Sequence, residues 1–110
     1  MSDAELADRL AARTLELIDI PSESGDEARL AAHLAPLLGA EDLGDTCLLV
    51  RRGAPVLLAG HLDTVPAQGN LPGRRDGERV HGLGASDMQG ALAVMVELAL
   101  AGAAVDRILH

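Results

Sequence analysis

The pattern of apolar and polar positions changes period several times along the chain. Apolar side chains recur every three or four residues over 3–19, 26–38 and 87–101, which predicts three helices. Short apolar runs over 46–52 and 56–60 predict two strands. Helices that alternate with strands are typical of a layered α/β fold, so we expect helices packed against a sheet.

Turn and capping residues set the expected ends of these elements. SDAE at residues 2–5 and SGDE at residues 24–27 both have the spacing of a capping box, which predicts the beginnings of the first two helices. Pro21 and Gly39 predict where those helices end. Residues 64–79 are rich in Gly, Pro, Asn and Arg and are expected to form a loop.

The remaining segments complete the sheet only in part. Residues 79–81 could form a short strand, and residues 105–110 have the pattern of a further strand at the end of the chain. No repeat, linker or change in composition marks a second domain. We therefore expect residues 1–110 to form the first portion of one α/β domain, with an incomplete sheet.

Composition excludes several kinds of partner. The chain carries 17 acidic and 9 basic side chains, for a net charge of −8, and has no Phe, Trp or Tyr. Nucleic-acid interfaces need basic surfaces and aromatic stacking, so nucleic acid is not an expected partner. The apolar run 91–101 contains Glu97 and is too short to span a bilayer, and the acidic N-terminus does not resemble a signal peptide. We expect a cytoplasmic protein with no membrane partner.

Candidate chemistry lies where the second predicted strand ends. In AGHLDTVP, residues 59–66, His61 and Asp63 are two residues apart, so they lie on the same side of an extended chain. A neutral imidazole is a common zinc ligand, and its other N–H usually donates to a carboxylate or carbonyl. Asp87 lies in a glycine-rich turn before the last helix. The three side chains together predict a metal site, although each alone could be a solvated loop residue or a cap.

Two motifs in order resemble one enzyme family. GHLDTVP at residues 60–66 is followed by HGLGASDMQGALAVMVELA at residues 81–99. Together they closely resemble the dinuclear zinc aminoacyl hydrolases, which include succinyl-diaminopimelate desuccinylase, acetylornithine deacetylase, aminoacylase and carboxypeptidase G. The intervening NLPGRRDGERVHG most resembles the desuccinylase branch. The resemblance covers the whole chain but only the beginning of a family member.

The resemblance implies a role for each of the three side chains. His61 would be a terminal ligand of one metal ion, and Asp63 would be the catalytic aspartate that holds the His61 ring. Asp87 would bridge two divalent metal ions, zinc or alternatively cobalt. The fold would be a zinc-exopeptidase-like catalytic domain, with a cis peptide expected between Asp87 and Met88.

The same resemblance implies parts that lie outside residues 1–110. Family members have a Glu-Glu pair after the next strand, which supplies the general base and a metal ligand, and a smaller domain that mediates dimerisation. Glu97 is not a substitute for that pair, because it lies within a predicted helix. We expect an N-terminal portion of a catalytic domain that is inactive alone, and an intact protein that is a homodimer.

Three functions stay open at this point. The first is a metal-dependent amide hydrolase of the N-succinyl-LL-2,6-diaminopimelate desuccinylase type, which belongs to lysine and diaminopimelate biosynthesis. The second is a related N-acyl-amino-acid deacylase, dipeptidase or carboxypeptidase, again acting on a small N-acyl amino acid. The third is a non-catalytic remnant that binds one metal ion weakly or folds only in part.

A few other polar residues have weaker interpretations. The glycines before Asp87 resemble a dinucleotide fingerprint only weakly, because Asp87 occupies the position of its last Gly or Ala. Arg74 and Arg75 could receive a substrate carboxylate but are more simply solvated. His81 could line the cleft, and no ligand role is assigned to it.

Overall fold

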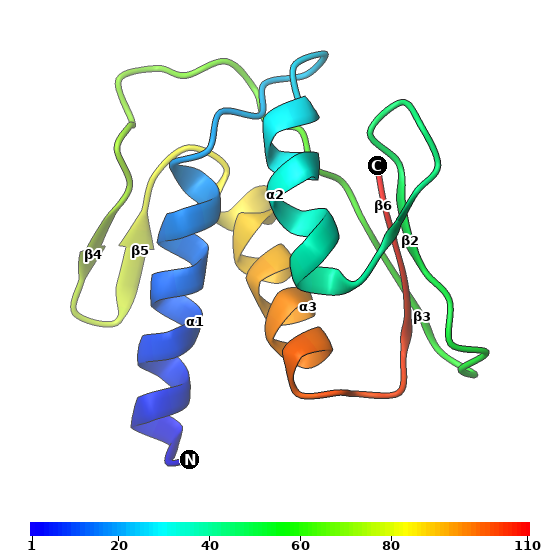
Figure 1. Ribbon diagram of the computed structural model, residues 1–110. Coiled ribbons are helices and arrows are strands. Elements are labelled where there is room, and N and C mark those ends of the chain that lie inside the picture. Colours follow the sequence, from blue (N-terminus) through cyan, green and yellow to red (C-terminus); the bar gives the residue numbers. More distant parts are fainter.

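The computed structural model describes residues 1–110 as three helices, a four-stranded sheet and a separate hairpin (Figure 1). The layered α/β arrangement is as predicted. The helices are α1 (Asp3–Ile18), α2 (Ala28–Leu38) and α3 (Gly90–Leu100), and a wide turn, η1 (Ala85–Gln89), precedes α3. The strands are β1 (Glu41–Asp42), β2 (Leu48–Val50), β3 (Leu57–Gly60), β4 (Arg74–Asp76), β5 (Arg79–His81) and β6 (Asp106–Leu109).

The main sheet is mixed, and its only parallel pair brings the two halves of the chain together. The strand order is β1-β2-β6-β3, with β6 antiparallel to β2 and parallel to β3. In the parallel pair Leu57 is opposite Asp106 and Gly60 is opposite Leu109. Parallel neighbours need a long crossover connection, and here it contains the hairpin, η1 and α3. Residue 61 therefore leaves the sheet at the same edge as residue 110.

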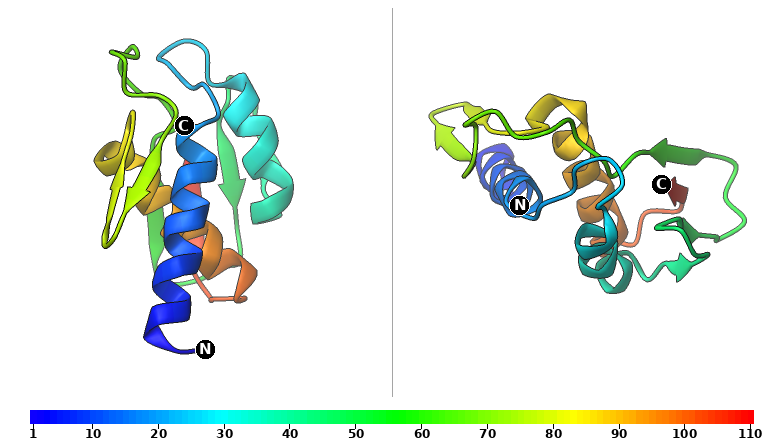
Figure 2. Two further views of the ribbon diagram at one scale, coloured as in Figure 1. Left: turned by 90° about the vertical axis from the view of Figure 1, so that its left-hand side faces the viewer. Right: turned by 90° about the horizontal axis from the view of Figure 1, so that it is seen from above.

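The helices form two layers on one side of the sheet. The helices α2 and α3 cover the sheet, and α1 packs against α3 on the side away from it, next to the β4–β5 hairpin (Figure 2). The core is aliphatic, as expected for a chain without aromatic residues, and includes Leu17, Leu30, Leu34, Leu48, Leu62, Leu92 and Leu109. None of the helices has the length and apolar character needed to cross a membrane.

One of the two helix starts predicted from capping boxes is correct, with one of the two hydrogen bonds of the box present. The Ser2 hydroxyl accepts a hydrogen bond from the backbone N–H of Glu5 at 3.2 Å, so α1 begins as predicted. The second prediction is wrong, because α2 begins only at Ala28 and its N-cap, Glu27, makes no side-chain cap. The Glu27 carboxylate instead accepts from the backbone N–H of Gly25 at 2.7 Å. Ser24 is therefore free to serve another purpose.

Two further segments differ from the sequence predictions. The expected loop over residues 64–79 contains β4, which pairs with β5. The last helix, expected over 87–101, begins at Gly90 because Asp87 (φ −139°, ψ 84°) and Met88 (φ −137°, ψ 38°) are not helical. The expected cis peptide between Asp87 and Met88 is present.

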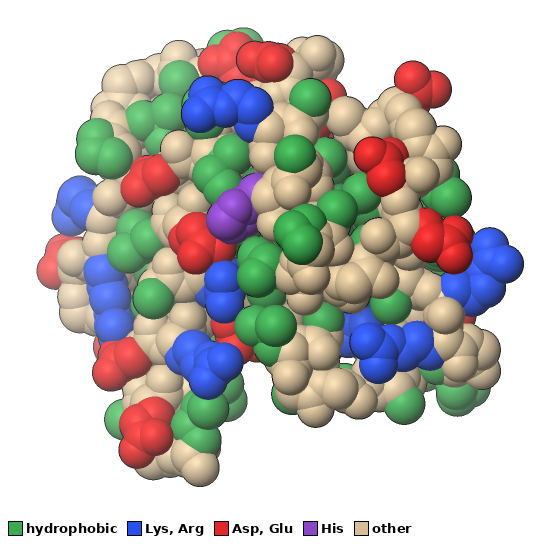
Figure 3. Space-filling view, in the orientation of Figure 1, with side chains coloured by type: hydrophobic (Ala, Val, Ile, Leu, Met, Phe, Trp, Pro, Cys, Tyr) green, Lys and Arg blue, Asp and Glu red, His purple; other side chains and the backbone are tan.

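A network of charged side chains joins the three helices. Glu97 of α3 accepts from Arg9 Nε at 2.7 Å and from Arg13 Nε at 3.1 Å, both on α1. Arg13 also donates to Glu16 at 2.9 Å, and the same Glu16 oxygen lies 2.8 Å from His33 Nε2 on α2. Figure 3 shows acidic, basic and histidine side chains side by side along these helices. Only 10% of the Glu97 side chain is exposed, so removing the two arginines would leave its carboxyl group with few polar partners.

We predict that Glu97→Gln lowers the free energy of unfolding by about 1–2 kcal/mol, between the values for exposed and buried ion pairs. Urea denaturation followed by far-UV circular dichroism would measure the change. Glu41→Gln, an exposed change on β1, is the matched control and should have almost no effect. Equal losses in both variants would contradict a special role for Glu97.

Candidate metal centre

The candidate site forms where the segment after β3 meets η1. His61 directly follows β3, and its backbone N–H donates to Met88 Sδ at 3.3 Å. Gly60 lies so close to the same side chain that a Cβ on it would be 2.8 Å from Met88 Cε. The Met88 side chain therefore fixes the distance between the strand end and the turn that carries Asp87.

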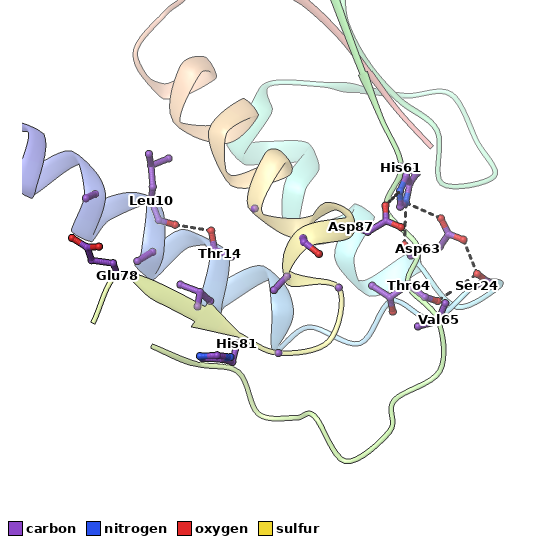
Figure 4. A pocket seen from close by; sticks show the side chains of 18 residues that line it. Leu10, Thr14, Ser24, His61, Asp63, Thr64, Val65, Glu78, His81 and Asp87 are labelled. Carbon is purple, nitrogen blue, oxygen red and sulfur yellow. Dashed lines mark hydrogen bonds and ion pairs between the residues drawn. The ribbon is translucent and has the colours of Figure 1, made fainter. Parts of the chain in front are cut away.

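The His61 ring lies between two acceptors, as Figure 4 shows. Its Nε2 is 2.8 Å from Asp87 Oδ1. Its Nδ1 is 3.0 Å from the Asp63 carbonyl oxygen and 3.1 Å from Asp63 Oδ1. The predicted convergence of His61, Asp63 and Asp87 at the carboxyl edge of the sheet is therefore observed.

These contacts shift two pKa values in opposite directions. The pKa of His61 is raised, chiefly by the hydrogen bond to Asp87 and further by the Asp63 carbonyl, against partial burial. The pKa of Asp63 is lowered, chiefly by the hydrogen bond from Ser24 and further by the nearby His61 charge, again against partial burial. The site thus favours a protonated His61 ring beside an ionised Asp63 carboxylate.

The donor types suit a metal ion, but the set is incomplete. An imidazole nitrogen and a carboxylate oxygen are both common zinc ligands. Around a tetrahedral ion with metal–ligand distances of about 2.0–2.1 Å, the two donor atoms would lie roughly 3.3 Å apart, so the 2.8 Å contact of His61 with Asp87 would open only slightly. No group of three or more His, Cys, Asp or Glu side chains in the chain is arranged around one point. Within residues 1–110, His61 and Asp87 are therefore the two candidate ligands.

The site opens into a cavity of about 780 Å³ between α1, β5 and η1. His61, Asp63 and Asp87 lie at one end of this cavity, and His81 lines it further along, as its sequence position suggested (Figure 4). Arg75 does not reach the cavity, because it donates to Asp8 of α1 at 2.7 Å. The suggested role of Arg75 in binding a substrate carboxylate is therefore not supported.

Sequence reasoning missed two contributors to this site. Ser24 donates to Asp63 Oδ2 at 2.6 Å, although its spacing to Glu27 had indicated a helix cap. Ser22 is buried, and its hydroxyl accepts from Nε2 of Gln89, the last residue of η1, at 3.3 Å. No local pattern could have revealed either contact, because 39 residues separate Ser24 from Asp63 and 67 separate Ser22 from Gln89.

Sequence comparisons agree with the resemblance noted above. Residues 57–106 match peptidase family M20/M25/M40. A curated protein of Mycobacterium tuberculosis, named as a succinyl-diaminopimelate desuccinylase DapE, is 48% identical over 96 residues, covering 78% of this chain and 27% of that protein. A succinyl-diaminopimelate desuccinylase of Corynebacterium glutamicum is 37% identical over 92 residues, covering 74% of this chain and 25% of its own length. The chain thus spans about a quarter of the length of these relatives.

Structural comparison gives the same fold. Human carnosine dipeptidase 1 matches with a TM-score of 0.76 at 19% identity, over 97% of this chain and 32% of that protein. A tripeptidase of Staphylococcus aureus matches with a TM-score of 0.70 at 22% identity, over 94% of this chain and 36% of that protein. The structural matches show the same layered α/β fold, and the sequence matches indicate the peptidase and hydrolase class. Residues 57–106 belong to peptidase family M20/M25/M40, and the similarity to the Mycobacterium tuberculosis relative extends over 96 residues.

We predict that Gly84→Ala lowers the free energy of unfolding by more than the cost of placing alanine at a positive φ. Gly84 has φ +73°, and a Cβ there would lie 2.6 Å from Cγ2 of the buried Thr64. Gly69 has φ +75° with nothing within 4 Å, so Gly69→Ala is the matched control. We expect a loss of about 1–2 kcal/mol in the free energy of unfolding for Gly69→Ala and a further 1–3 kcal/mol, roughly, for Gly84→Ala. Similar urea midpoints for the two variants would contradict the predicted clash.

Proposed function

We propose that this chain is part of a metal-dependent amide hydrolase of the succinyl-diaminopimelate desuccinylase type. The observation that carries the proposal is the 2.8 Å contact between His61 Nε2 and Asp87 Oδ1, with Asp63 behind the ring. The 48% identity to a relative named for that activity supports the choice of substrate. The substrate would be N-succinyl-LL-2,6-diaminopimelate, a small N-acyl amino acid, and the pathway would be lysine and diaminopimelate biosynthesis in the cytoplasm.

In this proposal each of the three side chains has a separate task. His61 binds one metal ion through Nε2. Asp63 accepts the hydrogen bond from Nδ1, which keeps the Nε2 lone pair directed at the ion. Asp87 would hold both ions through its carboxylate. Its side chain is 85% exposed and lines the cavity, and the contact with His61 engages only Oδ1.

The two metal ions, zinc or alternatively cobalt, would supply a polarised scissile carbonyl and a water of lowered pKa. In this proposal residues 1–110 orient the centre and do not supply the general base. Glu97, the acidic residue of α3, is paired with Arg9 and Arg13. We therefore propose that the general base, the remaining ligands and a dimerisation domain belong to the rest of the protein, and that the intact protein is a homodimer.

We predict that residues 1–110 bind zinc weakly and that His61→Ala and Asp87→Ala each reduce the affinity at least tenfold, since each removes one of two ligands. Asp63→Ala should cost about 10-fold or more, as expected when the partner of a ligating histidine is lost. Competition with a chromophoric chelator would measure the affinities. His33→Ala and Asp76→Ala remove the same groups away from the site and should leave zinc affinity unchanged. Unaltered affinity in Asp87→Ala would contradict the proposed ligand role.

We predict that residues 1–110 alone do not release succinate from N-succinyl-diaminopimelate, because the general base typically contributes about 10²–10⁴-fold. A chimera in which these residues replace the matching segment of the Mycobacterium tuberculosis relative should release succinate when zinc is added. Asp87→Ala in the chimera should abolish turnover, and Asp76→Ala should not.

The same assay separates the open functions. Preferential release of acetate, or cleavage of a dipeptide, would indicate a related deacylase or peptidase instead of a desuccinylase. The proposed roles of His61 and Asp87 would be unchanged. A folded chimera that binds zinc but hydrolyses none of these substrates would favour a non-catalytic remnant. Full activity in the Asp87→Ala chimera would contradict the bridging role.

A further inference from the structure

We propose that Ser24 is a positioning residue of the metal centre, which holds the Asp63 carboxylate that in turn orients the His61 ring. This inference rests on the proposed function for its purpose, because a metal ligand is what the oriented ring would serve. The contacts themselves are independent of any metal ion. They join the segment between α1 and α2 to the segment after β3.

The two oxygens of Asp63 face opposite partners. Oδ2 accepts from the Ser24 hydroxyl at 2.6 Å, and Oδ1 lies 3.1 Å from His61 Nδ1. A carboxylate held at both oxygens cannot rotate about its own axis without losing one contact. Without Ser24, the Asp63 carboxylate could turn away from His61, leaving the ring to its backbone contact with the Asp63 carbonyl at 3.0 Å.

The Ser24 hydrogen bond is exposed, so its effect depends on how firmly Ser24 is held. The Ser24 backbone N–H donates to the Thr64 carbonyl at 3.0 Å, and the Thr64 N–H donates to the Ser22 carbonyl at 2.8 Å. Glu23 and Thr64 form an isolated parallel bridge, and the Glu23 carboxylate accepts from the Ala67 N–H at 3.1 Å. These contacts hold the Ser24 hydroxyl at Asp63 before any ligand arrives, which reduces the entropy that the contact would otherwise cost.

The segment that contains Ser24 also contacts η1, the turn that carries Asp87. Ser22 is 2% exposed, and its hydroxyl lies 3.3 Å from the side-chain nitrogen of Gln89, which is 1% exposed. Gln89 is the last residue of η1 and follows Asp87 by two positions. Residues 22–24 therefore contact both the segment that carries Asp63 and the turn that carries Asp87. We call residues 22–24 the brace.

A purely structural interpretation of Ser24 makes a different prediction. If the hydroxyl only fastened the loop to its neighbours, its loss would lower stability and leave the His61 ring as it is. Ser24 does not cap α2, since that helix begins at Ala28 behind Glu27. The decisive question is whether deleting the hydroxyl changes the environment of His61, and whether it does so through Asp63.

The experiment compares Ser24→Ala with Ser24→Thr, which keeps the hydroxyl, in the 110-residue chain. Ser2→Ala is the matched control, since it also removes a hydroxyl hydrogen bond but at the opposite end of α1. Two readouts are recorded at one fixed pH. The first is the ¹⁵N shift of His61 Nδ1 without metal, and the second is zinc affinity by chelator competition. Ser24→Ala is then repeated in an Asp63→Ala background.

We expect Ser24→Ala to move the Nδ1 shift and to weaken zinc binding by roughly 3- to 10-fold, less than the loss of a direct partner of the ligand. Ser24→Thr should restore both readouts, and Ser2→Ala should change neither. In the Asp63→Ala background the substitution should have no further effect, because Ser24 acts through Asp63.

The two readouts separate this inference from the proposed function. An unchanged Nδ1 shift in Ser24→Ala, or an equal effect without Asp63, would overturn the positioning role even if zinc binds. A moved shift that Thr restores would support the positioning role even if the parent chain binds no zinc, and the absence of binding would then count against the metal centre itself.

Discussion

The parallel pairing of β3 with β6 is the constraint on which the rest of the structure depends. Two parallel strands must be joined by a crossover, and this crossover contains η1 and α3. Its geometry returns the chain to the sheet at the start of β6, after η1 has passed over the carboxyl end of β3. His61 and Asp87, 26 residues apart, meet for that reason. The site is thus a consequence of topology first and of side-chain chemistry second.

The chemistry of the side chains then determines what the site formed by His61 and Asp87 can bind. A histidine with an acceptor at each ring nitrogen is stabilised as a cation, as its raised pKa indicates. A divalent ion between Nε2 and Asp87 would take the place of that Nε2 proton and satisfy the same carboxylate. A proton and a divalent ion would thus use the same two groups, His61 Nε2 and Asp87, while Asp63 lies at Nδ1. Whatever fixes Asp63 consequently acts on the site in either state.

The sequence predicted those features that depend on local pattern. Alternation along an extended chain placed His61 and Asp63 on one side, and the strand before them placed both at a sheet edge. The missed contacts of Ser24 and Ser22 depend on partners distant in sequence, whereas the missed strand β4 depends on its hairpin partner. Arg74–Asp76 has poor strand propensity and becomes β4 only by pairing with β5.

Helix signals failed for related reasons. The spacing from Ser24 to Glu27 fits a capping box, in which the Ser24 hydroxyl would accept from the Glu27 N–H. The hydroxyl instead donates to Asp63, which local spacing cannot show. The apolar period of α3 gives no sign that Asp87 and Met88 leave the helix, because the φ and ψ angles at those residues are set by the turn next to β3 rather than by periodicity.

The sheet is less well packed than the helices, which explains why the contacts of residues 22–24 are important for holding the site. In the sheet, β3 is an edge strand with Leu57 exposed. The fully buried Arg107 of β6 donates only to the Val105 carbonyl, and its Nε and Nη2 have no hydrogen-bond partner. Such a guanidinium is costly, and burial lowers its pKa. The helices, by contrast, are joined by an aliphatic core and by the Glu97 network. A site fixed only by the end of β3 would share the weakness of the sheet edge. The contacts of residues 22–24 also connect the site to the segment between α1 and α2, which belongs to the better packed helical layer.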